Sequence, residues 1–308
     1  MTPSTLTTVS GIWALAAAAL VLGLAYYAAV LDGVLTARDD GVAVRVRTPL
    51  SESARLLRQR RRVTVAADRL LWRIGGGGLI AAALLMVTVV PLGRWTLFDL
   101  DVGVVWFNAM DVVVWALVWL AGWGPNSAHS LIGGYRFLAQ ALGYELPLMF
   151  ALVAPAIAAE SLRVGTVADA QQGLWYVVWM PVAFVVYCIG VLGFSVWGPM
   201  SAAFGADIAG GAAAELSGVD RLLVLAGRYA LLAAGSAFAV PLFLGGGAGP
   251  ILPGWLWVIV KTVVLLTILV WLRRPLLRPD KFMEVGWLLL LPAVLVQDLI
   301  VAIVAVWR

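Results

Sequence analysis

Residues 174–197 read LWYVVWMPVAFVVYCIGVLGFSVW, a run of 24 residues without a charged side chain. A helix needs about 20 apolar residues to cross the roughly 30 Å hydrocarbon core of a bilayer. The apolar residues of this run are continuous rather than alternating, which favours a helix over a strand of a membrane barrel. The stretch therefore predicts a transmembrane helix.

Similar apolar stretches recur along the whole chain. Hydrophobic residues make up 63% of the 308 residues and charged residues only 12%, whereas a soluble domain carries about 25% charged residues. We place eight helices near residues 6–31, 73–93, 101–122, 139–162, 174–197, 221–245, 254–272 and 285–307. The expected fold class is an all-α integral membrane protein, an eight-transmembrane-helix bundle, with residues 1–308 forming a single membrane domain.

The basic residues are unevenly distributed between the connections. Sixteen of the 21 Lys and Arg fall on one side if eight helices alternate, and ten of these sixteen are Arg within residues 32–73. Cytoplasmic loops of membrane proteins carry such an excess of positive charge. We therefore expect a multi-pass protein of a bacterial or archaeal cytoplasmic membrane, with both termini outside the cytoplasm.

The connection 32–72 is the longest polar stretch, and residues 49–72 mix leucines with many arginines. We expect it to form a basic amphipathic cytoplasmic helix between the first two membrane helices. Two interpretations stay open: the helix lies on anionic membrane lipid, or it docks a peripheral subunit. Nucleic acid is not expected as a partner, because the orientation rule already accounts for the basic residues.

The connection 198–220, GPMSAAFGADIAGGAAAELSGVD, is too weakly apolar to span a membrane and too long for a tight turn. Loops of this length in a compact protein are usually functional. We expect a cytoplasmic functional loop that carries the acids Asp207 and Glu215. The glycines 75–78 at the start of the second helix are expected to allow close helix packing.

Charged residues also lie in the interior of the apolar stretches, among them Asp111, Glu145, Arg228, Lys261 and Asp298. A charge at the centre of a membrane helix costs roughly 2.5–3.5 kcal/mol on insertion scales. For Asp111, Glu145 and Lys261 two interpretations stay open, a buried polar pair that holds helices together and a path that couples ion movement to conformation. With one cysteine and one histidine, the chain has no multi-cysteine or multi-histidine metal site and no catalytic constellation.

At these residues the sequence resembles a known family, the H subunit (subunit 1) of respiratory NADH:quinone oxidoreductase and the homologous membrane subunit of formate-hydrogenlyase-type hydrogenases. The longest matching patch is residues 98–148, which ends in SLIGGYRFLAQALGYELPL. Its matching positions are Gly103, Gly122, Trp123, Asn126, Ser127, Leu131, Ile132, Gly133, Arg136, Ala139, Gln140, Tyr144 and Glu145. Further matches are Lys261, Thr262, Trp271, Arg273, Asp280, Met283, Trp287, Pro292, Pro49, Glu52, Arg55, Glu215, Ser217, Gly218 and Tyr229.

The resemblance implies a membrane subunit that links a peripheral iron–sulphur redox arm to proton or sodium translocation. The implied partners are iron–sulphur subunits of hydrogenase-like or quinone-reductase-like type and antiporter-like membrane subunits. The implied ion-coupling or quinone-cavity residues are Glu145, Tyr144, Arg136, Gln140, Asp111, Lys261, Asp207, Glu215 and Arg228. The implied docking residues for the arm are Glu52, Arg55, Arg58, Arg61, Arg62, Arg273, Arg278 and Asp280.

The chain departs from the family in the loop before Glu215. Family members carry an acidic string there, beside the quinone cavity, and this chain keeps only Asp207. Arg228 also stands where the family has glutamate. No cofactor is therefore expected on this chain alone, the usual quinone chemistry is not expected, and the hydrogenase-related branch or a divergent paralogue is favoured. Two alternatives to a coupling subunit are a stand-alone secondary ion or solute transporter and a membrane-embedded lipid transferase, which the lack of catalytic residues disfavours.

Overall fold

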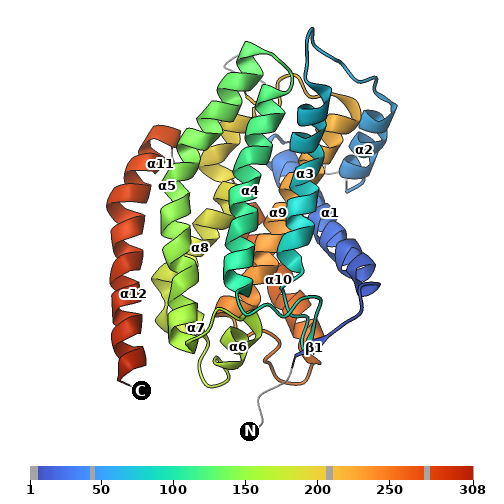
Figure 1. Ribbon diagram of the computed structural model, residues 1–308. Coiled ribbons are helices and arrows are strands. Elements are labelled where there is room, and N and C mark those ends of the chain that lie inside the picture. Colours follow the sequence, from blue (N-terminus) through green and yellow to red (C-terminus); the bar gives the residue numbers. More distant parts are fainter. Residues whose placement is uncertain (1–5, 42–45, 206–210, 274–277, 308) are drawn as a thin grey trace.

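The computed structural model describes residues 6–41, 46–205, 211–273 and 278–307, which form a helical bundle (Figure 1). Its α-helices are α1 (Trp13–Asp39), α2 (Thr48–Arg58), α3 (Arg69–Val87), α4 (Gly103–Trp123), α5 (Ala128–Ala159), α6 (Val164–Asp169), α7 (Tyr176–Trp179), α8 (Pro181–Phe194), α9 (Gly218–Phe243), α10 (Gly254–Trp271), α11 (Pro279–Val285) and α12 (Leu291–Val306). The other elements are the strands β1 (Thr7–Thr8) and β2 (Trp95–Thr96), the 3₁₀ helix η1 (Gly198–Phe204) and the π-helix η2 (Gly286–Leu290).

Within the described residues, eight helical stretches are long and apolar enough to cross a membrane. The fifth stretch joins α8 to η1, and the eighth runs from α11 to the end of α12. This confirms the predicted all-α membrane fold with eight transmembrane helices. The helix α2, between the first two spans, is shorter than the predicted 49–72 and ends at Arg58.

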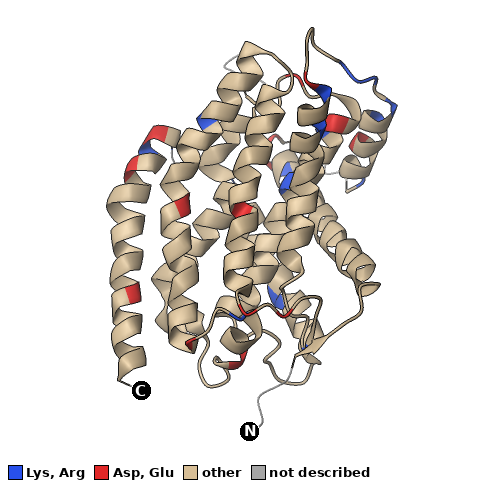
Figure 2. Cartoon of the chain, viewed as in Figure 1, with Lys and Arg blue, Asp and Glu red and all other residues tan. Residues whose placement is uncertain are grey.

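The two ends of the bundle differ in charge. Figure 1 places α2 at one end and β1, α6 and the end of α12 at the other. Figure 2 shows Lys and Arg gathered around α2 and the start of α3. We call the end with α2 the basic end, and the end with β1 the terminal end.

The first, fourth, fifth and eighth spans begin six or more residues from the predicted positions. The predicted fifth helix, 174–197, is divided, because α7 is a separate short helix and the span itself begins at Pro181. Thr7 and Thr8, predicted to be helical, instead pair in parallel with Trp95 and Thr96, so α1 begins only at Trp13. This pairing brings together residues almost ninety positions apart, which a local apolar pattern cannot anticipate. The helix α5 begins at Ala128 and has 32 residues. Its first turns are more polar than the rest, so the apolar pattern did not include them in the predicted span.

The helix α9 lies at the centre of the bundle, with most of its side chains buried. Its Phe238 stacks on Phe107 of α4 with ring centroids 3.8 Å apart. The glycines after Arg73 also let α3 approach α4, since a Cβ on Gly75 would lie 2.4 Å from the backbone nitrogen of Ala121. The expected role in close packing is confirmed for Gly75 and Gly78, whereas a Cβ on Gly77 would meet no atom within 4 Å.

Candidate functional site

The helices α4 and α5 pack side by side and bring together a buried polar cluster. Asp111 of α4 is fully buried, and Tyr144 and Glu145 of α5 are 1% and 8% exposed. The Tyr144 hydroxyl donates to Asp111 Oδ1 at 3.4 Å and accepts a hydrogen bond from Trp115 Nε1 at 3.0 Å. We call Asp111, Trp115, Tyr144 and Glu145 the carboxylate cluster.

The two carboxylates of this cluster are neighbours. Asp111 and Glu145 interact with each other electrostatically, and Asn108 also lies against Glu145. Among the described residues, Asp111 Oδ2 and both carboxylate oxygens of Glu145 have no hydrogen-bond partner of normal geometry. Burying a charge without such partners is costly, so two charged carboxylates side by side at this place are unfavourable.

The helix α5 lacks one backbone hydrogen bond beside the cluster. Pro147 lies inside the helix and has no N–H to donate to the carbonyl of Gly143. The π-helix η2 approaches at that point, since a Cβ on Gly286 would lie 2.2 Å from the Gly143 carbonyl oxygen. Proline kinks and π-turns mark places where a helix departs from its regular hydrogen bonding. Tyr144 and Glu145 therefore sit at an irregular part of α5.

A polar stripe on α5 leads from the basic end to the cluster. Arg136, Gln140 and Tyr144 follow one another at four-residue spacing, which places them on one face of the helix. Gln140 is buried, and its side-chain carbonyl has no partner among the described residues. The sequence prediction of these three positions together with Asp111 and Glu145 thus corresponds to one continuous region.

Arg228 occupies a different site, beside the break between α8 and η1. Its guanidinium lies 4.1 Å from the ring centre of Trp197 and 5.4 Å from that of Phe204. It also donates to the carbonyl of Val196, a residue with a backbone φ of +62°. This cation is held by aromatic rings, a favourable arrangement when it is shielded from water.

Lys261 lies at the terminal end and is fully hydrogen-bonded. Its ammonium donates to the carbonyls of Leu244, Gly246 and Ala248 at 2.6, 2.9 and 2.7 Å and stands 4.1 Å from the ring centre of Trp175. We call these three carbonyls and the Trp175 ring the lysine cage. The structure thus separates Lys261 from the carboxylate cluster with which the sequence had grouped it.

The predicted loop acid Glu215 lies at the basic end, where it accepts a hydrogen bond from Ser127 Oγ at 2.9 Å. Asp207 falls in residues 206–210, outside the described part of the chain. The segment after α2 is tied to the same region, since Arg62 N donates to Ser217 Oγ at 2.7 Å and Arg61 lies 3.3 Å from Asp220.

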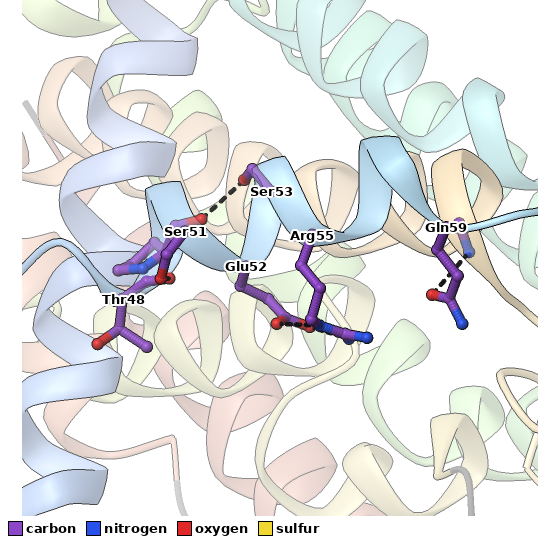
Figure 3. Close-up of polar contacts among 8 residues, drawn as sticks. Thr48, Ser51, Glu52, Ser53, Arg55 and Gln59 are labelled. Atoms are coloured by element: carbon purple, nitrogen blue, oxygen red, sulfur yellow. Dashed lines mark hydrogen bonds and ion pairs between the residues drawn. The ribbon is translucent and has the colours of Figure 1, made fainter.

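The predicted docking residues divide into exposed and buried ones. On α2, Arg55 Nε donates to Glu52 at 2.7 Å (Figure 3), and this hydrogen bond lowers the pKa of the Glu52 carboxyl. Arg58 and Arg62 are exposed, and Arg278 pairs with Asp280 at 3.2 Å on the surface. Arg273, the remaining predicted docking residue, is not exposed.

Arg273 is buried rather than exposed. It pairs with Asp32 of α1 and donates to the Thr36 hydroxyl at 2.7 Å, and burial lowers its pKa. Its role is to join α10 to α1, so it does not belong to an exposed surface.

Trp115 is the residue of the cluster that the sequence analysis missed. Its position, four residues after Asp111, places it on the same face of α4, and this spacing is the signal that could have indicated it. Its partner, however, is on α5, and the packing of the two helices had to be known.

Comparison with known proteins identifies similar sequences over most of the chain. A family model described as NADH dehydrogenase matches residues 44–302. An NADH-quinone oxidoreductase H subunit of Geobacter metallireducens is 32% identical over 265 residues, covering 82% of this chain and 80% of that protein. An H subunit of the same enzyme from Geobacter sulfurreducens is 31% identical with the same coverage, and one from Cereibacter sphaeroides is 36% identical over 220 residues, 70% of this chain and 69% of that protein.

Proposed function

Because the chain belongs to the NADH dehydrogenase family, with relatives that are H subunits of NADH-quinone oxidoreductase, we propose that it is the membrane subunit linking an iron–sulphur redox arm to ion translocation. It is a multi-pass membrane protein of a complex I-like assembly, and a stand-alone transporter is not favoured. The proposed neighbours are iron–sulphur subunits at the basic end and antiporter-like subunits in the membrane.

The observation that carries the coupling proposal is the carboxylate cluster at the end of the polar stripe. The stripe of Arg136 and Gln140 starts near the basic end and reaches Tyr144, and beyond it lie two adjacent carboxylates short of partners. Two carboxylates that face each other away from water cannot both carry charge cheaply. A proton taken up or released there would change the charge of the cluster, and the irregular α5 backbone would let the helix respond.

The basic end is the proposed docking surface. The segment from Glu52 to Arg62 is anchored to the N-terminus of α9, because Arg62 N donates to Ser217 Oγ and Arg61 pairs with Asp220. Arg278 and Asp280 extend this surface, and Arg273 is left out because it is buried. With this end in the cytoplasm, both termini face the other side.

Quinone is proposed to be absent from this chain's own chemistry. The support is that Arg228 stands where the resemblance places a glutamate, and that Trp197 and Phe204 lie against its guanidinium. On this ground we favour a hydrogenase-related or divergent complex.

Purification of the tagged chain from its own membranes tests the assignment. In mild detergent we expect soluble subunits with iron–sulphur electron paramagnetic resonance signals to elute with it in fixed stoichiometry. Elution of the chain alone, folded and stable, would contradict the subunit proposal and support a transporter.

A triple charge reversal tests the docking surface. Arg58, Arg61 and Arg62 changed to Glu should release the iron–sulphur subunits while the chain stays in the membrane. A basic docking surface implies an acidic surface on the arm, and the new glutamates would repel it. Reversal of Arg38, Arg69 and Arg73, basic residues near the same end, is the matched control. If the arm stays bound after the first reversal, these arginines contact lipid instead.

A further inference from the structure

The helix α12 carries a single charged residue, and that residue is buried. Asp298 is 8% exposed, and neither oxygen of its carboxyl group has a hydrogen-bond partner among the described residues. It shares one face of α12 with Val294, Gln297 and Val301, which are buried as well. The helix packs against α5 and α8 at the edge of the bundle (Figure 1). The carboxyl group of Asp298 therefore lies between these helices, shielded from lipid.

The segments packed around Asp298 offer no positive charge. Every titratable residue of α5 lies at or before Glu145, η2 has none, and those of α7 and α8 are Tyr176, Tyr187 and Cys188. None of these last three side chains becomes a cation. A carboxylate buried with neither a cation nor a hydrogen-bond donor is costly, and such a group takes up a proton instead. The surroundings of Asp298 therefore favour the uncharged acid.

The level of Asp298 in the bundle follows from the contact between η2 and α5. Both α5 and the run from η2 through α12 lead from the basic end to the terminal end (Figure 1), and Gly286 lies directly against Gly143. Asp298 is twelve residues beyond Gly286, and Glu145 is two beyond Gly143. At about 1.5 Å per residue, Asp298 is roughly 15 Å closer to the terminal end than Glu145. Among the described residues it is the one buried acid outside the carboxylate cluster.

Both neighbours of α12 are irregular at this level. Counting in parallel from the same contact places Pro155 of α5 opposite Asp298, and Pro155 has no N–H to complete the helical hydrogen bonding. The other neighbour is interrupted between α7 and α8, where Trp179 is the last residue of α7. Gln297, next to Asp298, donates to the Trp179 carbonyl at 3.3 Å. Buried acids beside interrupted helices are typical of the sites at which membrane transporters bind ions.

We propose that Asp298 is a second proton-binding site of this chain, on the terminal-end side of the carboxylate cluster. It holds a proton while α12 is packed against α5 and α8, and it exchanges this proton with water at the terminal end. Val306 ends α12 eight residues later, roughly 12 Å away. Only an O–H bond forms and breaks, as the proton passes between water and a carboxylate oxygen. The inference rests on the proposed function, because such a site is of use only where electron transfer is coupled to ion movement.

Labelling of the complex in its own membranes with dicyclohexylcarbodiimide tests the protonated state. This membrane-soluble reagent adds to a protonated carboxyl group: a carboxyl oxygen bonds to the carbodiimide carbon, the proton moves to a nitrogen, and nothing leaves. At neutral pH we expect the added mass on Asp298, located by fragmentation in a mass spectrometer. Glu284 is the matched control, because it is exposed and pairs with Lys281, and it should stay unlabelled.

Two results of this experiment would overturn the proposal. Protection of Asp298 by sodium chloride, but not by potassium chloride, would make sodium the bound ion instead of a proton. If Asp298 stays unlabelled, infrared spectroscopy decides, because the carbonyl band of a protonated carboxyl group must then be present in the wild type and missing in Asp298→Asn. Identical bands in the two proteins would mean that Asp298 holds no proton.

Proton translocation in vesicles tests the role of the site. Asp298→Asn keeps the size of the side chain and can still donate a hydrogen bond, but it cannot release a proton, so the proton-to-electron ratio should fall severalfold. Asp298→Glu keeps the acid and should restore most of this ratio. A normal ratio in Asp298→Asn would make Asp298 a structural group and overturn the inference.

Glu145→Gln, measured in the same way, separates this inference from the proposed function. A loss in Glu145→Gln beside a normal ratio in Asp298→Asn overturns the inference alone, whereas normal ratios in both overturn the proposed coupling as well. If Asp298→Asn does not assemble, the labelling of the wild type decides, and that readout does not depend on electron transfer.

Discussion

The carboxylates of Asp111 and Glu145 and the ammonium of Lys261 are all buried inside apolar helices, but their hydrogen bonding differs. Three of the four carboxylate oxygens have no hydrogen-bond partner of normal geometry among the described residues, whereas the ammonium of Lys261 has three carbonyl acceptors and an aromatic ring. The sequence alone does not distinguish the carboxylates from the lysine, because each is a charged side chain in a membrane span.

The difference indicates which buried charge is suited to change during function. A lysine with all three donors used has no reason to move, and its cage is held in turn by Gln171, which accepts from the Gly245 N–H at 3.0 Å. The carboxylate cluster keeps acceptor capacity unused beside Pro147, where α5 lacks one backbone hydrogen bond. We therefore expect substitutions in the cluster to affect coupling, and substitutions in the cage to affect stability.

The largest expected effect is that of Glu145→Gln. The amide keeps the size of the side chain and removes its ability to gain or lose a proton, so the complex should assemble and transfer electrons but build no ion gradient. The measurement is gradient formation in vesicles, divided by the electron-transfer rate.

Glu160→Gln is the matched control, because Glu160 is exposed at the end of the same helix, and its gradient should be normal. A normal gradient at a normal electron-transfer rate in Glu145→Gln would make the cluster structural, like the cage.

The second effect is on stability. Lys261→Met removes the ammonium and leaves one buried and two part-buried carbonyls without their donor. A buried group left unsatisfied costs about 1–3 kcal/mol. We expect a lower thermal transition of the purified complex and an unchanged ion-to-electron ratio in the molecules that assemble. Lys261→Arg should not restore stability, since a planar guanidinium does not match a cage shaped for an ammonium.

Lys281→Met is the control for this change. Lys281 is exposed and pairs with Glu284 on the surface, and exposed pairs contribute little. If Lys261→Met left the transition where it was and lowered the ion-to-electron ratio, Lys261 would belong to the coupling machinery after all.

The sequence predicted the fold well because each apolar span is a local property. The lengths of the eight spans follow from hydrophobic runs, and the glycines at 75–78 indicated the contact of α3 with α4. The strand Thr7–Thr8 was missed because its partner lies at Trp95 and Thr96, far along the chain.

The candidate site was predictable only residue by residue. Asp111 and Glu145 were recognisable as charges in apolar stretches, but their proximity depends on how α4 packs against α5. For the same reason Lys261 could not be separated from them, since its acceptors are backbone carbonyls of a loop, which carry no sequence signal. Arg273 was assigned to the surface by its position after a helix, although Asp32 and Thr36 bury it.

The smallest expected effect comes from Trp115→Phe, which sharpens the contrast within the cluster itself. The substitution keeps an aromatic ring against Tyr144 and removes the N–H that the Tyr144 hydroxyl accepts at 3.0 Å. One hydrogen bond of this kind contributes about 1 kcal/mol, so the orientation of the hydroxyl toward Asp111 should be weakened and not lost. The ion-to-electron ratio in vesicles should fall by a fraction, well short of the loss in Glu145→Gln.

Trp119→Phe is a close control, because Trp119 lies on the same helix and its indole N–H has no partner among the described residues. Equal ratios in the two tryptophan variants would mean that the Trp115 hydrogen bond does not orient the cluster. A complete loss in Trp115→Phe would mean that coupling requires this hydrogen bond as much as it requires Glu145.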